Sequence, residues 1–192
     1  MFPTFHRAAF RAAFLVLAFA PGLSAFAMNS HLIFLGTYTR DGSRGIYAVR
    51  LDAATGALST PTLAAESPNP AWITLSPDKK FLYAIHESQA QAVGFAVDAT
   101  AAKLTALPAA PSPAAQPPSH LAVDATGRTL LAANYREGYV ASMAIHADGT
   151  LGPPTVIKHT GKSVNPTRQD QPHVHSVTLS PDNRFVIVCD LG

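Results

Sequence analysis

The sequence predicts an all-β fold made of repeated four-stranded sheets. When Thr37, His86, Asn134 and Asp190 are aligned, the apolar runs that lead to them fall into register, with spacings of 49, 48 and 56 residues. A second apolar run and a turn such as Ser76-Pro77-Asp78 precede three of these runs, and two further extended segments follow three of them. Four strands in about 45 to 50 residues, repeated along a chain, indicate a β-propeller, whose blades are four-stranded sheets around a channel.

Each strand of the repeat has its own pattern. The first strand is predicted from the runs beginning at Ile73, Leu121 and Val177, and the second from residues 32–36, 82–86, 130–134 and 186–190. The third is predicted from the segments beginning at residues 46, 93 and 140, and a fourth begins at the leucine after each polar turn. In residues 47–51 apolar side chains alternate with small or charged ones, as in a strand whose two faces differ in burial. After residue 28 no segment has a convincing helical stripe.

Counted in order, these strands make three blades and a fraction. A closed ring needs at least four blades, so this length of chain is not expected to remove its own sheet edges by closure. Unpaired apolar edge strands are templates for association. We therefore expect self-association through open blade edges, and a complete protein about twice this length.

The first 27 residues do not belong to this fold. Arg7 and Arg11 give a basic start, residues 12–20 are apolar, and Ala25 and Ala27 are small residues before a cleavage point. This pattern is typical of a secretory signal peptide. The alternative, a membrane anchor, needs about 20 apolar residues, and the run here is too short. The sequence thus predicts a signal peptide at 1–27, a partial propeller at 28–192, a periplasmic or secreted location, and no membrane association after the signal is removed.

Composition excludes one class of partner. Without the two arginines of the predicted signal the chain has 12 basic and 12 acidic residues, and no cluster of positive charge suggests nucleic-acid binding. The single cysteine, Cys189, cannot form an intramolecular disulfide, and its apolar neighbours predict a small buried side chain.

Several motifs resemble one family. They are Gly-Thr-Tyr-Thr from Gly36, Asn-Pro-Ala-Trp from Asn69, the segment from His120, Ala-Asn-Tyr from Ala133, and above all residues 165–192. Together they resemble the seven-bladed propeller lactonases, which include bacterial 6-phosphogluconolactonase and the fungal muconate-lactonizing enzymes. The resemblance covers residues 31–192, about three and a half blades of the seven-bladed ring. It implies an active site at the channel mouth that uses histidine, present here, with arginine and glutamate beyond Gly192.

Strand geometry independently predicts where a site lies. Consecutive antiparallel strands reverse direction, so residues before the first strand and after the second emerge at one end of a blade. Residues 172–176 therefore share that end with Asp190, Tyr135 and Glu87, whereas the Ser-Pro-Asp turns lie at the opposite end. Because the first strand is innermost, we expect His173 and His175, two apart on one strand, to project near the channel.

Histidine suits the chemistry that the resemblance implies. Opening a lactone requires a base for the attacking water and a donor or cation for the developing oxyanion, and imidazole can act as that base near neutral pH. We predict catalytic roles for His175 and His173, against the alternative of hydrogen-bonded structural histidines. A metal pair would need a third ligand, and none is identifiable, so we predict no metal.

Three further residues are candidates for substrate binding. Arg168 lies in the loop before the histidines and has the bidentate geometry that suits a phosphate or carboxylate. Glu87 and Asp190 are candidates for binding sugar hydroxyls, although polar residues that end strands more often satisfy turn backbone, the interpretation favoured for Asn134.

The sequence therefore predicts a secreted lactonase, similar to 6-phosphogluconolactonase, that hydrolyses a sugar lactone without a cofactor once the protein is complete. Its partner is a small-molecule sugar lactone. Residues 28–192 alone are expected to be inactive. Two alternatives stay open: a non-catalytic periplasmic propeller that binds a protein or glycan, and a muconate-type lactonizing cyclase.

Overall fold

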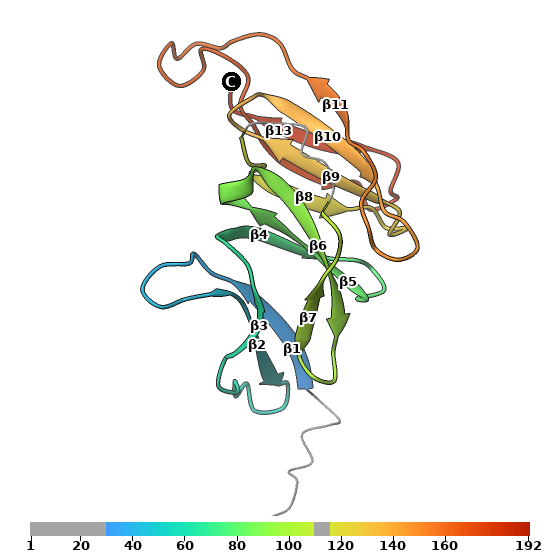
Figure 1. Ribbon diagram of the computed structural model, residues 1–192. Helices are drawn as coiled ribbons and strands as arrows, with labels where there is room; N and C mark the ends of the chain where they lie inside the picture. Colours follow the sequence, from blue (N-terminus) through green and yellow to red (C-terminus); the bar gives the residue numbers. More distant parts are fainter. Residues whose placement is uncertain (1–29, 110–115) are drawn as a thin grey trace, which may run out of the picture.

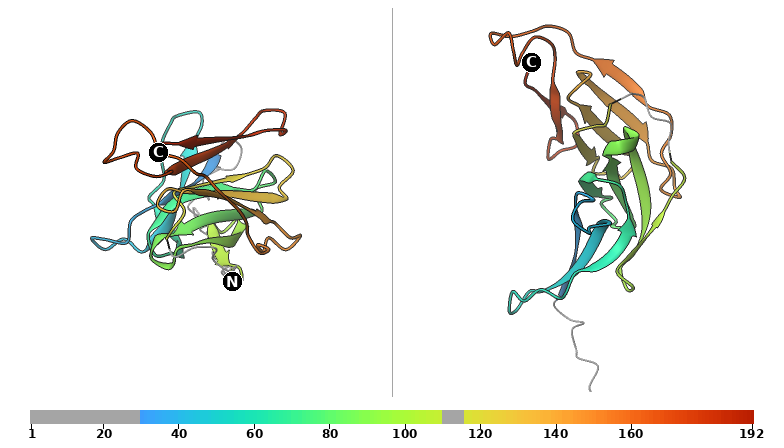
Figure 2. Two further views of the ribbon diagram at one scale, coloured as in Figure 1. Left: turned by 90° about the horizontal axis from the view of Figure 1, so that it is seen from above. Right: turned by 60° about the vertical axis from the view of Figure 1, so that its left-hand side comes forward.

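A computed structural model describes residues 30–109 and 116–192, and the predicted signal peptide lies outside them. Their strands form four antiparallel sheets of three, four, four and two strands. The sheets follow one another along an arc (Figures 1 and 2). The strands are β1 (Ser30–Gly36), β2 (Gly45–Asp52), β3 (Thr62–Glu66), β4 (Pro70–Leu75), β5 (Phe81–His86), β6 (Gln91–Asp98), β7 (Lys103–Ala106), β8 (His120–Val123), β9 (Thr129–Asn134), β10 (Tyr139–Ala144), β11 (Thr155–Lys158), β12 (Val174–Leu179) and β13 (Val186–Asp190).

This arrangement confirms the predicted β-propeller blades and their strand count. Each sheet is ordered as its strands occur in the chain, and β1, β5, β9 and β13 end at or beside the four aligned repeat positions. The helical content of the described residues is a single 3-10 turn, η1 (Glu87–Gln89). Among those residues no helix is long and apolar enough to cross a membrane.

Apolar side chains hold neighbouring blades together. Between the two complete sheets, Tyr83 and Ile85 of β5 pack with Leu121, Leu130 and residues of β10 in one buried cluster. The hydroxyl of Tyr83 also crosses this interface, donating to the carbonyl oxygen of Gly149 at 3.0 Å. Burial raises the pKa of Tyr83 to about 12, so it remains a neutral donor. The two faces with which the complete sheets meet are therefore core, as expected for stacked blades.

The last sheet departs from expectation at its outer strand. We predicted a buried Cys189, but the structure leaves it exposed, together with Val186 and Ile187 of β13. The prediction was wrong because an apolar strand is buried only where another sheet covers it. In the described residues β13 has β12 as its single hydrogen-bonded neighbour.

Candidate functional site

The ends of the strands define two opposite faces. Strand pairing places Pro70 opposite His86, His120 opposite Ala133, and Val174 opposite Asp190, so the start of each inner strand lies beside the end of the next. The turns such as Ser76–Phe81 close the other end of the same hairpins. The structure thus confirms that the residues before β4, β8 and β12 share one face.

A pocket of about 520 Å³ opens on this face. That volume falls within the range of small-molecule sites, about 300–1,000 Å³. Residues from all four sheets and their connections line it: Tyr38, Ala71, Glu87, Pro117, Pro118, Ser119, Tyr135, Arg136, Arg168, His175 and Leu191. Three of the predicted site residues, His175, Arg168 and Glu87, are therefore brought together from positions up to 88 residues apart in the sequence (175 − 87).

His175 reaches the pocket through an irregularity in β12. The pairing with β13 shifts between Val174 and Ser176, so His175 is an extra residue in its strand. Such a bulge bends the strand and redirects a side chain, and bulges are common beside active sites. The side chain of Ser119 donates to the backbone oxygen of His175 at 3.0 Å, which ties the bulge to the preceding inner strand. His175 is exposed and meets the ring of Tyr135 edge-on, with centroids 5.8 Å apart.

His173 occupies a different environment. It precedes β12, and its side chain is only 12% exposed. The ring stacks on Tyr135, and Nδ1–H donates to the carbonyl oxygen of Tyr135 at 2.9 Å. The expectation that both histidines lie on one strand does not hold, because β12 begins at Val174, after His173. Both rings nevertheless contact Tyr135. Of the two, His175 is the one that lines the pocket.

The charged groups of the pocket come from loops. Arg168 follows a turn in which its backbone N–H donates to the side chain of Asn165 at 3.2 Å. Within the described residues the guanidinium of Arg168 has no ion-pair partner. Glu87 opens η1 directly after β5, and Arg136 follows the end of β9. The pocket thus combines two cations, one carboxylate and one imidazole.

Asp190 is held by structural contacts. Its carboxylate accepts hydrogen bonds from the backbone of His173 at 2.7 Å and of Gly192 at 2.9 Å, and it pairs with Nδ1 of His159 at 2.6 Å. Burial alone would raise the pKa of Asp190, but these hydrogen bonds outweigh burial and lower it. Asp190 therefore fixes the segment that carries His173. Asn134 is likewise structural, as predicted: it is fully buried and its amide donates to Gln116 and Tyr139.

Sequence reasoning missed Arg136 and Tyr38. Arg136 is two residues beyond Asn134, so the rule that residues after the second strand reach this face would have found it. Tyr38 comes from the loop after β1. The guanidinium of Arg40 lies over its ring, with the guanidinium carbon 4.9 Å from the ring centroid. The same rule would have found this tyrosine, because Tyr38 follows the repeat position Thr37 as Glu87 follows His86.

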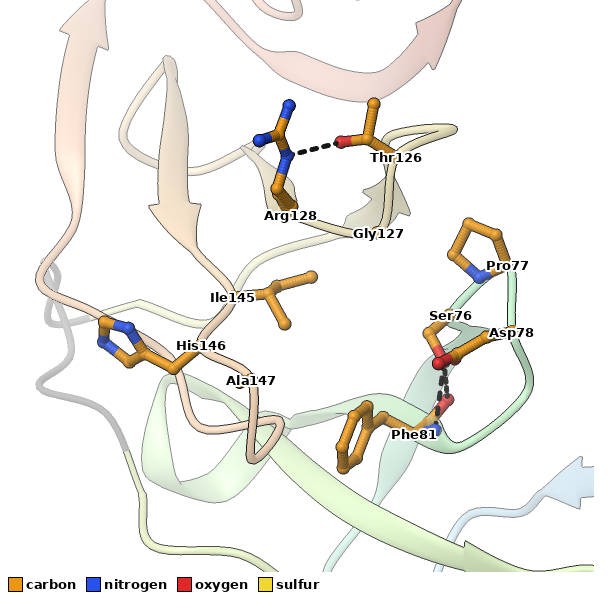
Figure 3. A pocket seen from close by; sticks show the side chains of 10 residues that line it. All are labelled: Ser76, Pro77, Asp78, Phe81, Thr126, Gly127, Arg128, Ile145, His146 and Ala147. Carbon is orange, nitrogen blue, oxygen red and sulfur yellow. Dashed lines mark hydrogen bonds between the residues drawn. The ribbon is translucent and has the colours of Figure 1, made fainter.

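A second pocket, of about 380 Å³, lies on the turn face between the two complete blades (Figure 3). Arg128 and Thr126 stand on one side of it, and Ser76, Asp78 and Phe81 on the other. The carboxylate of Asp78 already accepts the hydroxyl of Ser76 at 2.7 Å, and this hydrogen bond lowers its pKa. The polar groups here complete the turns of the repeat. The described residues contain no cluster of three or more metal-ligating side chains on either face.

The pocket with His175 has the groups for opening an ester or lactone. An imidazole can take a proton from water, guanidinium groups can bind an oxyanion or an acidic substituent, and a carboxylate can bind hydroxyls. An aromatic ring beside the imidazole restricts its orientation. These are the features of a small-molecule site.

Comparisons with known proteins agree with this geometry. Residues 32–192 match the family model described as "Lactonase, 7-bladed beta-propeller". The chain is 34% identical over 172 residues to the 6-phosphogluconolactonase of Bacillus subtilis, covering 86% of this chain and 48% of the relative. It therefore spans about half the length of the curated relatives it matches.

Two solved structures show the same relationship. The chain superimposes on a putative 6-phosphogluconolactonase from Bacteroides fragilis with a TM-score of 0.78 and 30% identity, over 90% of this chain and 48% of that one. It superimposes on the periplasmic gluconolactonase of Pseudomonas aeruginosa with a TM-score of 0.75 and 30% identity, over 85% and 48%. The seven-bladed ring of the family is thus the architecture in which these blades belong.

Proposed function

The chain belongs to the seven-bladed β-propeller lactonase family, and on that premise we propose that the complete protein hydrolyses a sugar lactone to the open aldonic acid. The observation that carries the proposal is the convergence of His175, Arg168 and Glu87 in one pocket at the predicted face. Apart from water, the reaction needs only groups that a protein supplies.

The chemistry assigns a role to each group. His175 removes a proton from water as the water oxygen bonds to the lactone carbonyl carbon. The carbonyl oxygen becomes an oxyanion, which hydrogen-bond donors and cations stabilise. When the tetrahedral intermediate collapses, the bond from this carbon to the ring oxygen breaks, and His175 returns the proton to that oxygen. General base catalysis of this kind contributes about 10²–10⁴-fold to the rate.

The remaining predicted site residues support this arrangement. Arg168 and Arg136 bind an acidic or strongly polar part of the substrate, and Glu87 binds ring hydroxyls. His173 and Asp190 hold the segment from which His175 projects, through the contacts with Tyr135 and with each other. His173 therefore contributes to catalysis by positioning.

We propose an unphosphorylated aldonolactone as the substrate and the periplasm or exterior as the location. The support is the signal-like segment 1–27, since phosphorylated sugars are metabolites of the cytosol, and the likeness to a protein described as a periplasmic gluconolactonase. The Bacillus subtilis relative is described as a 6-phosphogluconolactonase. The presence or absence of a phosphate is therefore the main choice to test.

The test uses the complete protein and two lactones, glucono-δ-lactone and its 6-phosphate, with acid release followed near neutral pH. The wild-type protein should hydrolyse at least one lactone faster than the uncatalysed reaction. His175→Ala should lower that enzymatic rate by about a hundredfold or more. His146→Ala, a histidine at the turn face, should leave the rate unchanged. A folded complete protein with no rate above background on either lactone would overturn the proposal. If the protein instead converts muconate-type acids to lactones, its activity is that of the lactonizing cyclase.

A further inference from the structure

An aromatic contact joins the inner strands of two neighbouring blades at the edge of the pocket. The two residues in contact, Trp72 and His120, directly follow the lining residues Ala71 and Ser119 but do not themselves line the pocket. The rings of Trp72 in β4 and His120 in β8 lie 4.0 Å apart between centroids and are inclined by 38°. The indole Nε1–H of Trp72 donates to the backbone oxygen of Leu121 at 2.9 Å, which fixes the indole against β8. Trp72 is nevertheless 39% exposed. The indole of Trp72, which is partly exposed to solvent, therefore holds the imidazole of His120 in place.

The two nitrogens of His120 are not equivalent. Nδ1 is buried and has no hydrogen-bond partner within the described residues. A neutral imidazole carries its proton on one nitrogen only, and a buried N–H without an acceptor is costly. The proton therefore belongs on Nε2, and Nδ1 keeps its lone pair. His120 then has one hydrogen-bond donor, Nε2–H, for which the described residues supply no acceptor.

The surroundings keep His120 uncharged. Burial, and to a smaller degree the neighbouring His175, lower its pKa, so the imidazole is neutral near pH 7. The next residue back, Ser119, donates its hydroxyl to the backbone oxygen of His175 at 3.0 Å. His120 and His175 therefore lie on the inner strands of neighbouring blades, which the side chain of Ser119 links at the pocket.

We propose that His120, which follows the lining residue Ser119 at the edge of this pocket, is a further catalytic residue whose Nε2–H donates a hydrogen bond to the carbonyl oxygen of the bound lactone. The inference rests on the proposed function. A neutral donor with a fixed orientation suits an oxygen that gains negative charge as His175 activates water, because no reorganisation is needed during the reaction. Trp72 holds this donor in place.

Two amide substitutions separate the two ring nitrogens. The side-chain N–H of His120→Gln lies near the position of Nε2, whereas that of His120→Asn lies near Nδ1. We expect His120→Asn and His120→Ala to lower kcat by about ten- to a hundredfold in the complete protein, with a smaller change in KM. His120→Gln should retain activity within a few-fold, and His146→Gln at the turn face should match wild type. Thermal unfolding of all variants checks the fold.

A binding measurement separates this inference from the proposed function. The probe is glucono-δ-lactam, whose carbonyl accepts the same hydrogen bond but which does not hydrolyse as the lactone does. His120→Asn should bind it at least tenfold more weakly than wild type and His120→Gln. If wild type binds the lactam in this way but hydrolyses neither lactone, the lactonase proposal fails while the role of His120 as a donor stands. The inference would be overturned if His120→Gln and His120→Asn weakened lactam binding equally, or if neither weakened it. It would also be overturned if the wild-type protein did not bind the lactam.

Discussion

The imidazole of His173 is stacked on the ring of Tyr135, with centroids 4.4 Å apart and ring planes 16° from parallel. The same tyrosine meets His175 edge-on at 5.8 Å, so one ring contacts both histidines of the segment before and within β12. The tyrosine comes from the end of β9, in the preceding blade. The position of the proposed base is thus determined across a blade interface.

Removing this ring should reduce activity more than stability. In the complete protein Tyr135→Ala is expected to lower kcat/KM at least tenfold, because His175 loses the ring that restricts it. The loss of the stacked pair should cost about 1 kcal/mol of unfolding free energy. Tyr135→Phe keeps the ring and should retain near-normal kinetics. Lactone hydrolysis and denaturant unfolding measure the two effects, and equal kinetics for Ala and Phe would contradict the role.

Arg168 should distinguish the two candidate substrates. If its guanidinium binds an acidic group, Arg168→Ala should raise KM for a phosphorylated lactone about tenfold or more, and much less for the unphosphorylated one. Arg168→Lys should recover part of the affinity, since a point charge replaces a bidentate one. Arg184→Ala, at an exposed turn beside Phe185, is the control. Equal KM changes for both lactones would argue against recognition of a phosphate.

Asp124 joins two blades at the turn face and gives a pH-dependent contribution to stability. It is buried at 8% exposure, and Asn183 of the next blade donates to its carboxylate at 3.2 Å. Burial would raise its pKa, but hydrogen bonds from the turn and from Asn183 outweigh burial and lower the pKa from 3.8 to about 2. A lowered pKa means that the contribution is complete above pH 3.8 and is lost as the pH falls toward 2.

We therefore expect Asp124→Asn to lower the free energy of unfolding of the complete protein by about 2 kcal/mol at pH 7. The difference from wild type should shrink between pH 3.8 and about 2. Asp52→Asn, at the half-buried end of β2, should have a smaller effect, because its carboxylate accepts only from the backbone of Ala54 and Thr55 among the described residues. Denaturant titrations at several pH values measure these differences. A constant difference down to pH 2 would exclude the carboxylate as their source.

The repeat could be predicted from the sequence because strands leave a local pattern. Short apolar runs such as residues 45–52 form strands, and the turn before Phe81 reflects backbone geometry on a scale of a few residues. The predicted difference in burial between the two faces of residues 47–51 is not seen, because the adjacent residues Ala48 and Val49 are both buried. Whether an apolar strand is covered depends on a neighbouring sheet, which no local pattern records. Cys189 was misassigned for that reason.

The site was only partly predictable. Strand direction placed His175 and Glu87 on one face, since that follows from antiparallel order alone. Arg168 was a candidate because it lies in the loop that leads to the histidines. The bulge at His175 was not predicted. It leaves only a weak trace in the sequence, since the buried residues Val174 and Val177 of β12 are three positions apart where regular alternation would place them two or four apart. The contacts of His120 with Trp72 and with the buried surroundings of Nδ1 depend on how adjacent blades pack, and single-chain periodicity contains no information about that.

A glycine controls the approach to the histidines. Gly138 has a φ of +63°, and a Cβ there would lie 2.7 Å from the backbone oxygen of Pro172, next to His173. Gly138→Ala should therefore displace this segment and cost more than the about 1 kcal/mol expected for positive φ alone. Gly56 has a φ of +73° and open space around it, so Gly56→Ala measures the cost of the positive φ without a clash. Unfolding and lactone kinetics of both variants test this, and equal costs would contradict the clash.

The last prediction concerns residues 28–192 produced alone. Phe185, Val186 and Ile187 are 60%, 44% and 56% exposed, and β13 has one free edge in the described sheet. An exposed apolar edge strand pairs with other chains, so the polypeptide should self-associate at micromolar concentration. Ile187→Lys should shift it toward the monomer, because a charge on an edge strand opposes further pairing.

Val164→Lys is the matched control, since Val164 is 93% exposed but lies in a loop outside any strand. Light scattering and sedimentation velocity give the mass of each species. The same polypeptide should show no lactonase activity above the uncatalysed rate, because misplacing catalytic groups by about 1 Å already costs about a hundredfold and only part of the ring surrounds His175. A monodisperse monomer would show that β13 is protected in solution. A rate that is lost in His175→Ala would show that these blades suffice to build a working site.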